Sequence, residues 1–97
     1  MRKVISGQSF EWDEEKDKQN KQKHGVDFET AAQVFFDPYH VEIPDDFHSD
    51  EEPRYKVIGL VHNLLLVICT DREDAKRIIS ARKANAKERS AYNGDRA

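Results

Sequence analysis

Hydrophobic residues are densest in the second half of the chain, where polar connections separate three short runs. The runs are residues 54–61, 64–70 and 75–82, and Val, Ile and Leu supply most of their interior positions. β-Branched residues suit a pleated, half-buried surface, so each run is predicted to be a strand. The short connection His62-Asn63 makes the first two strands antiparallel, with Asn63 expected to adopt the positive φ of the turn. The predicted product is an antiparallel meander that needs helices over one face.

A fully polar helix is predicted upstream of this meander. Asp13 suits the N-cap position, and Gly25 suits the left-handed position that ends a helix. Between them, residues 14–24 include no hydrophobic side chain. One face of this helix carries four polar side chains at helical spacing: Lys16, Asn20, Lys23 and His24. Either the helix is solvated and held at its ends by Trp12 and Val26, or this face lines a functional site.

An amphipathic helix is predicted next, and it is expected to cover the sheet. Asp27 suits its N-cap, its apolar residues fall on one face, and Pro38 ends it. Beyond it, residues 39–43 alternate between apolar and polar as a further strand. Residues 45–53 are predicted to be an acidic loop.

The two ends of the chain give weaker signals. Asn85 and Glu88 fit a capping box at the start of a short basic helix that reaches Tyr92. Residues 1–9 are predicted either to pair as an edge strand or to fray. Residues 1–97 are therefore expected to form one α+β domain, in which two N-terminal helices pack on a small antiparallel sheet and a short C-terminal basic helix follows.

Charge is distributed unevenly along the chain. The formal net charge of −3 argues against a protein that coats nucleic acid indiscriminately. Residues 37–53 nevertheless contain seven acids and no Lys or Arg, whereas residues 76–89 contain six cations and one acid. The basic segment fits a localised anion site, and a solvated surface explains both segments equally well.

Cysteine and histidine usage limits the available chemistry. The single cysteine, Cys69, excludes an internal disulfide and fits a reducing cytoplasm, and its apolar neighbours predict a small core residue. The four histidines show no metal-ligand spacing, so neither a metal site nor a cofactor is expected. No stretch is long and apolar enough to be expected to span a membrane.

The remaining polar residues fit RNA cleavage by the substrate's own 2′-hydroxyl. That reaction needs a proton acceptor, cations around the phosphate and a proton donor for the leaving 5′ oxygen. His24 is the candidate base, with Lys23 beside it. The candidate phosphate ligands are Arg54, Arg77 and Arg82. Ordinary surface ion pairs with the acidic segment are the competing explanation for each arginine.

Motifs along nearly the whole chain carry a resemblance to one known family. In the first half they are Trp12-Asp13, Lys16, Asn20, Lys23-His24-Gly25, Phe28, Ala31 and Asp37-Pro38. In the second half they are Glu52-x-Arg54, Ile58-Gly59, Thr70-x-Arg72, Arg77-Ile78-Ile79-Ser80-Ala81-Arg82 and Glu88-Arg89. In this order and spacing they resemble the BrnT toxin family. Two positions depart from the pattern: Cys69 stands where Tyr or His is common, and Asn85 where Thr is common.

The resemblance implies a RelE-like fold and the toxin of a type II toxin–antitoxin pair, an endoribonuclease that blocks translation. It also implies neutralisation by a BrnA-type antitoxin with a ribbon-helix-helix part, in a 2:2 complex that reaches operator DNA only through the antitoxin. Catalysis is then expected of His24, Lys23, Arg54, Arg77 and Arg82. Substrate binding is expected of Lys16, Asn20, Glu52, Ser80, Glu88 and Arg89.

Two points stay open at the level of sequence. In an unbroken strand Ser80 and Arg82 share a face and Arg77 falls on the other, so a bulge or an early end of the strand is needed to unite them. Glu88 is fully explained by its capping box. The alternative function is a non-catalytic RelE-like partner domain that binds the antitoxin and acts in operon repression.

Overall fold

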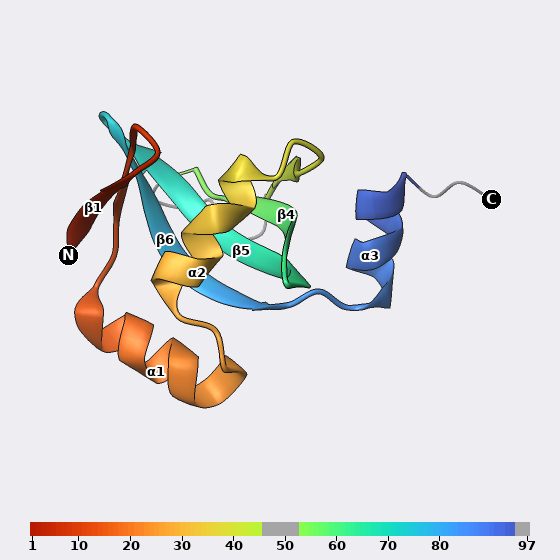
Figure 1. Ribbon diagram of the computed structural model, residues 1–97, viewed down its shortest axis with the longest axis horizontal. Coiled ribbons are helices and arrows are strands. Elements are labelled where there is room, and N and C mark those ends of the chain that lie inside the picture. The colour runs from red at the N-terminus through yellow and green to blue at the C-terminus, as the bar shows by residue number, and fades with distance from the viewer. Residues whose placement is uncertain (46–52, 95–97) are drawn as a thin grey trace.

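The computed structural model describes residues 1–45 and 53–94. In these residues a six-stranded sheet carries helices on one face, and a last helix lies beside the fourth strand at the C-terminal end (Figure 1). The strands are β1 (Arg2–Ile5), β2 (Gln8–Glu11), β3 (Val41–Pro44), β4 (Tyr55–Val61), β5 (Asn63–Arg72) and β6 (Ala75–Lys83). The helices are α1 (Glu14–His24), α2 (Phe28–Ala32), the short 3-10 helix η1 (Gln33–Phe36) and α3 (Ala86–Asn93). The predicted α+β class is confirmed.

The sheet is larger than predicted and is not purely antiparallel. Its strand order is β1-β2-β6-β5-β4-β3. The predicted meander of β4, β5 and β6 is present and antiparallel. However, β2 pairs parallel with β6, and β1 pairs with β2 rather than fraying, with Val4 opposite Ser9. The two helices predicted at the N-terminus therefore follow two strands. The pairing of β2 with β6 joins distant segments, so no local pattern reveals it.

Local capping determines where α1 and α3 begin and end. The Asp13 carboxylate accepts hydrogen bonds from the backbone N–H groups of Glu15 and Lys16 at 2.9 and 3.1 Å. Gly25 ends α1 in the left-handed region at φ +73°. Asn85 and Glu88 form the predicted capping box of α3. The predicted bounds of α1 and the predicted start of α3 are therefore confirmed, and α3 ends at Asn93, one residue beyond the predicted Tyr92.

Two local predictions need correction. The helix expected to run to Pro38 narrows into η1 at Gln33, as often happens at the end of an α-helix. The left-handed residue of the β4–β5 turn is His62, at φ +61°, and not Asn63. The reason is that β5 already begins at Asn63, so the turn closes one residue earlier.

The hydrophobic core lies between the sheet and the α2–η1 segment. Its fully buried side chains include Phe10, Phe28, Val34, Val57 and Val67. Gly59 allows η1 to approach the sheet closely, because a Cβ at this position would lie 2.7 Å from the Cβ of Val34. Cys69 is fully buried in the same core, as predicted.

α3 is attached to the body by polar side chains rather than by an apolar face. None of its residues is buried. Tyr92 donates a hydrogen bond to Asp37 at 2.6 Å, and Glu88 pairs with Arg82 of β6 at 2.8 Å. Within residues 1–45 and 53–94, no helix has the length and apolar character that crossing a membrane requires.

Candidate functional site

A bulge interrupts β6 in the middle of the basic segment. Ile78 lies opposite Cys69 of β5, and Ser80 lies opposite Ile68. Ile79 therefore has no partner in the register, which is the arrangement of a β-bulge. Either a bulge or an early end of the strand was predicted to place Arg77, Ser80 and Arg82 on one face. The bulge is the one that is present.

The bulge brings three predicted site residues to one face of the sheet. Their cross-strand partners are Thr70 for Arg77, Ile68 for Ser80 and Leu66 for Arg82. These three β5 residues alternate along their strand, and directly opposite residues share a face. The other face of β5 and β6 packs in the core with α2. Arg77, Ser80 and Arg82 therefore lie together on the face away from α2.

β4 extends this cationic surface. Lys56 lies opposite Ile68, and so it is on the same face as Ser80. Arg54 stands two residues before Lys56, and its carbonyl oxygen accepts the N–H of Asp45 at 3.0 Å, which continues the β3–β4 pairing and places Arg54 on the same side. We call the surface formed by Arg54, Lys56, Arg77, Ser80 and Arg82 the basic face. Lys56 was not predicted as a site residue, although its alternation with Arg54 was visible in the sequence.

Two carboxylates hold two of the arginines in place. Glu11 of β2 pairs with Arg77 at 2.8 Å, and Glu88 receives two hydrogen bonds from Arg82 at 2.8 and 2.9 Å. The Arg82 guanidinium holds the pKa of Glu88 below its usual range. Glu88 is therefore an anion at neutral pH. It binds Arg82 and also forms the capping box of α3. Glu11 was missed because its contact with Arg77 depends on the parallel pairing of β2 with β6.

α1 is docked by polar side chains, which explains how a helix without apolar residues packs. The Asn20 amide donates to the carbonyl oxygens of Ala81 and Val26, both at 2.8 Å. Its Oδ1 accepts the N–H of Ala81 at 3.2 Å. Asn20 thus pairs with the open edge of β6 as a neighbouring strand would, while Asp17 accepts the N–H of Phe28 at 2.8 Å. Asn20 is 7% exposed, so its observed role is structural.

α1 runs alongside β6 in the same direction (Figure 1). The pKa of Asp13, at its start, is lowered first by the hydrogen bond from the Lys16 backbone and in smaller part by the charges of Lys16 and Arg77. Asn20 meets Ala81 further along both elements. Lys16 is therefore near the Arg77 end of β6, whereas Lys23 and His24 follow Asn20 toward its other end. All three are solvent-exposed.

The remaining predicted site residues are scattered. Arg89 is exposed on α3 and reaches the carbonyl oxygen of Ala84 at 3.4 Å. Glu52 lies outside the described residues. Among residues that the structure does describe, no group of His, Cys, Asp and Glu side chains is arranged to hold a metal ion.

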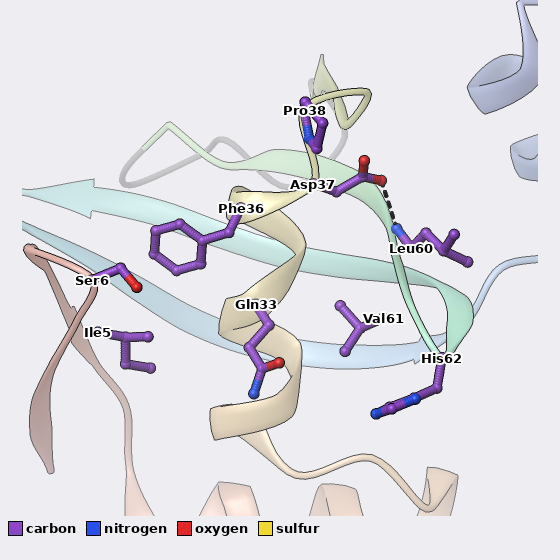
Figure 2. A pocket seen from close by; sticks show the side chains of 9 residues that line it. All are labelled: Ile5, Ser6, Gln33, Phe36, Asp37, Pro38, Leu60, Val61 and His62. Carbon is purple, nitrogen blue, oxygen red and sulfur yellow. Dashed lines mark hydrogen bonds between the residues drawn. The ribbon is translucent and has the colours of Figure 1, made fainter.

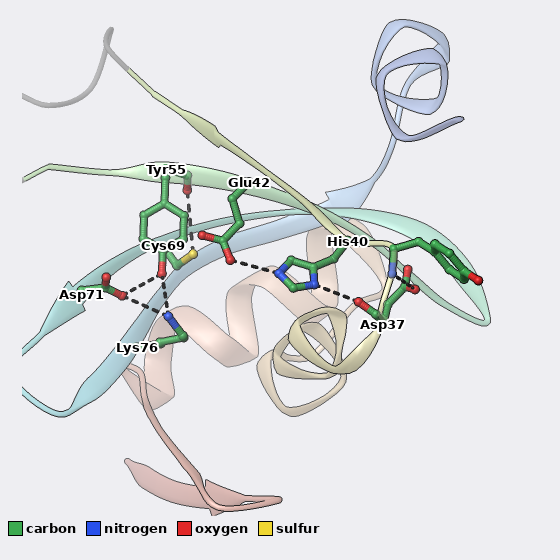
Figure 3. A network of polar contacts seen from close by, with 8 residues as sticks. Asp37, His40, Glu42, Tyr55, Cys69, Asp71 and Lys76 are labelled. Atoms are coloured by element: carbon green, nitrogen blue, oxygen red, sulfur yellow. Dashed lines mark hydrogen bonds and ion pairs between the residues drawn. The ribbon is translucent and has the colours of Figure 1, made fainter. Parts of the chain in front are cut away.

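A second polar cluster lies on the helix-covered side of the sheet (Figure 3). The Tyr55 hydroxyl donates to Asp71 at 2.7 Å and accepts from Lys76 at 3.2 Å. Burial raises the pKa of the nearby Cys69 thiol to about 12, so this thiol stays protonated at neutral pH. Lys76 is close to Asp71, which neutralises its charge. The cluster therefore offers neither a nucleophile nor an unneutralised cation, and the departure from the family pattern at Cys69 lies away from the basic face.

An open groove elsewhere on the molecule is also distinct from the basic face. Its volume is about 540 Å³, and Figure 2 shows its side chains converging from the β1–β2 turn, η1 and the end of β4. No Lys or Arg lines it. The Asp37 carboxylate at its rim is engaged by the backbone N–H of Leu60 and by the Tyr92 hydroxyl, at 2.8 and 2.6 Å. Exposed apolar side chains, including Phe36 and Leu60, make up much of the rest of the groove lining. This groove does not have the chemistry of a phosphate site.

Comparison with known proteins agrees with the sequence motifs. The profile of a family described as "Ribonuclease toxin, BrnT, of type II toxin-antitoxin system" matches residues 12–88. Among solved structures, the 1.1 Å crystal structure of the Brucella abortus ribonuclease toxin BrnT is similar, with a TM-score of 0.64 and 29% sequence identity. The alignment covers 78% of this chain and 95% of the Brucella chain. No protein among those with curated descriptions matches significantly.

The matched region contains α1, α2, the meander and the first residues of α3, and therefore every described residue of the basic face. It covers well over half of the chain. This chain belongs to the BrnT family of ribonuclease toxins of type II toxin–antitoxin systems.

Proposed function

We propose that this chain is an endoribonuclease that cleaves RNA by attack of a 2′-hydroxyl on the adjacent phosphate, in a metal-independent reaction. The observation that carries the proposal is the bulge at Ile79, which gathers Arg77, Ser80 and Arg82 on one face. Permanent, forked donors on a rigid sheet suit the phosphate of RNA.

The proposed reaction uses the basic face as an electrostatic clamp. The 2′ oxygen attacks phosphorus while the bond to the 5′ oxygen breaks, which gives a 2′,3′-cyclic phosphate. The leaving 5′ oxygen takes up a proton from water and becomes a 5′-hydroxyl end. Negative charge develops on the non-bridging oxygens, where Arg77, Arg82 and Lys56 act. Glu11 and Glu88 occupy the two guanidinium groups in the absence of substrate. Partly exposed ion pairs of this kind are worth only about 0–1 kcal/mol each, so a phosphate can replace the carboxylates at small cost.

The proton acceptor in this proposal is His24, with Lys23 beside it. Both are exposed at the end of α1 that follows the Asn20–Ala81 contact, so an RNA strand on β6 can reach them. Glu88 is the second candidate base, because its carboxylate already lies against Arg82 on the basic face. Lys16 and the undescribed Glu52 are the remaining candidates.

The decisive experiment compares RNA cleavage by the purified wild type with that of two substitutions on the same helix. His24→Gln should lose about 10²–10⁴-fold in rate, the usual effect of removing a general base. Lys18→Gln, an exposed change away from Lys23 and His24, should cleave at the wild-type rate. An RNA with a single 2′-deoxy nucleotide at the cleaved position should resist the wild type. If His24→Gln cleaves as fast as Lys18→Gln, the base is another residue.

The partner in this proposal is a BrnA-type ribbon-helix-helix antitoxin, which neutralises the toxin in a cytoplasmic 2:2 complex. That complex would contact operator DNA only through the antitoxin. Expression of this chain alone should arrest growth by blocking translation, and co-expression of the antitoxin should relieve the arrest. A 1:1 heterodimer at micromolar concentration in light scattering would contradict the stoichiometry.

A second candidate function is a non-catalytic partner domain that binds the antitoxin and takes part in operon repression. The observation that favours it is the engagement of Arg77 and Arg82 by Glu11 and Glu88. Purified protein that binds antitoxin and cleaves no RNA, together with normal growth during expression, would select this function.

A further inference from the structure

A shallow groove separates the β4–β5 turn from the link between β6 and α3. Leu60 and Leu64 form its apolar part, and His62, Lys83 and Arg89 bring cationic or titratable groups to it. None of the residues that line it is acidic. The side chains of His62, Lys83 and Arg89 are solvent-exposed.

This groove holds cations of the basic segment that no described acid neutralises. Three of the six cations in residues 76–89 have carboxylate partners: Lys76 with Asp71, Arg77 with Glu11 and Arg82 with Glu88. Lys83 and Arg89 make no ion pair with any residue in 1–45 or 53–94. Their charge is therefore available to an external anion.

The groove adjoins the basic face at the end of the sheet, through its apolar residues. Leu60 and Leu64 lie opposite each other on the same face of the sheet as Leu66 and Arg82, and Arg89 directly follows Glu88, the carboxylate that holds Arg82. Lys83, opposite Leu65, is the last paired residue of β6 and borders the groove from the other face at the end of the sheet. The backbone N–H of Ala84 bonds to the carbonyl oxygen of Leu64 at 2.9 Å, which continues the β5–β6 pairing beneath the groove. The backbone beneath the groove is therefore hydrogen-bonded into the same sheet that carries the basic face.

We propose that this groove binds the sugar–phosphate backbone of RNA that flanks the cleaved bond, with Lys83 and Arg89 as phosphate ligands and Leu60 against a ribose or base. This inference rests on the proposed ribonuclease function and extends its substrate site beyond the reacting phosphate. Cations with an apolar wall suit RNA, which offers anionic phosphates together with the apolar faces of its bases.

The expected effect of each cation follows from counterion release. Binding of single-stranded nucleic acid depends on salt with a slope of about 0.7 per neutralised phosphate, so removing one contact lowers affinity about fivefold at 0.1 M salt. The probe is a fluorescent 2′-O-methyl oligonucleotide, which lacks the attacking hydroxyl and is not cleaved. Lys83→Gln and Arg89→Gln should each reduce the salt slope by about 0.7, and the double substitution by about 1.4.

The matched control is Lys18→Gln, which removes the same charge from an exposed position near Glu14 and Asp17. It should leave the salt slope within error of the wild type. With cleavable RNA, the groove substitutions should raise the half-saturating RNA concentration while the rate at saturation stays unchanged.

Each other outcome has one interpretation. If Lys83→Gln and Arg89→Gln match Lys18→Gln in RNA binding while the wild type cleaves RNA, the groove proposal is overturned and the proposed function stands. If these substitutions weaken only the complex with the antitoxin, the groove is a protein-binding surface and the proposal is also overturned. If the wild type cleaves no RNA but the salt slopes fall as expected, the groove is supported and the proposed ribonuclease function is wrong.

Discussion

Asn20 provides the sharpest test of how a helix without apolar residues stays attached to the sheet. Asn20→Ala removes three hydrogen bonds, leaving the N–H and C=O of Ala81 and the C=O of Val26 without their partner. The site is 7% exposed, so water reaches it poorly. Each lost bond is worth about 1 kcal/mol, which gives about 3 kcal/mol in total. Alanine returns about 0.5 kcal/mol as a better helix former. The expected net loss in free energy of unfolding is therefore about 2.5 kcal/mol.

The measurement is urea unfolding followed by fluorescence of Trp12, the single tryptophan, which is buried at the start of α1. In thermal unfolding the same loss should lower Tm by about 10–20 °C, since 1 kcal/mol shifts a domain of this size by about 4–8 °C. Gln19→Ala, at an exposed position on the same helix, is the control and should change stability by at most about 0.5 kcal/mol. If Asn20→Ala loses less than about 1 kcal/mol relative to Gln19→Ala, polar docking does not hold α1.

Asn20→Asp keeps the size of the side chain and changes only its hydrogen-bond donors. One carboxylate oxygen can still accept the N–H of Ala81, but the other faces the carbonyl oxygens of Ala81 and Val26. This variant should be least unstable at low pH, where the acid is protonated and can donate. Burial beside carbonyl oxygens raises the folded-state pKa above the unfolded value of about 3.9, so stability should decline as pH rises past that value. A variant with pH-independent stability would show that the carboxyl does not contact these oxygens.

Two further predictions concern packing and charge. Gly59→Ala should lower the free energy of unfolding by about 1–3 kcal/mol, because the new Cβ would lie 2.7 Å from Val34 Cβ and 2.9 Å from its carbonyl oxygen; a Tm equal to that of the wild type would exclude this close approach. The hydrogen bonds from Arg82 lower the pKa of Glu88, so their stabilising effect should be complete above the unfolded pKa of 4.5 and fade as pH falls through the folded value. Glu88→Gln should remove this pH dependence, with a loss of about 0.5–1 kcal/mol at neutral pH after allowance for solvent exposure. Equal pH profiles for the two proteins would refute the pairing.

Features that depend on neighbouring residues could be predicted from the sequence. The N-cap at Asp13, the left-handed Gly25 and the capping box of Asn85 with Glu88 each need only a few adjacent residues, and all are present. The meander is likewise local, because short turns join its strands. The pattern of side chains therefore determined these elements without reference to the rest of the fold.

Features that depend on distant segments could not be predicted. Asn20 finds Ala81 across 61 positions of sequence, so a buried, structural asparagine resembled an exposed member of a polar face. The contact of Glu11 with Arg77 spans 66 positions and requires the parallel pairing of β2 and β6. In both cases the polar residue type was informative, but its partner could be identified only in three dimensions.

The unpaired residue of the β6 bulge affects both faces of the sheet, the buried core face and the basic face. Ile78 and Ala81 are both buried in the core although they are three positions apart, which an unbroken strand does not allow. Arg77 and Arg82 are five positions apart, which would likewise place them on opposite faces of an unbroken strand, yet both lie on the basic face. Because Ile79 is outside the pairing, the alternation of side chains shifts by one residue between the two halves of β6. The two core residues can therefore share one face, and the two arginines can share the other. The burial of Ile78 and Ala81 therefore fixes the orientation of the two arginines, and the stability of the core holds the basic face in place.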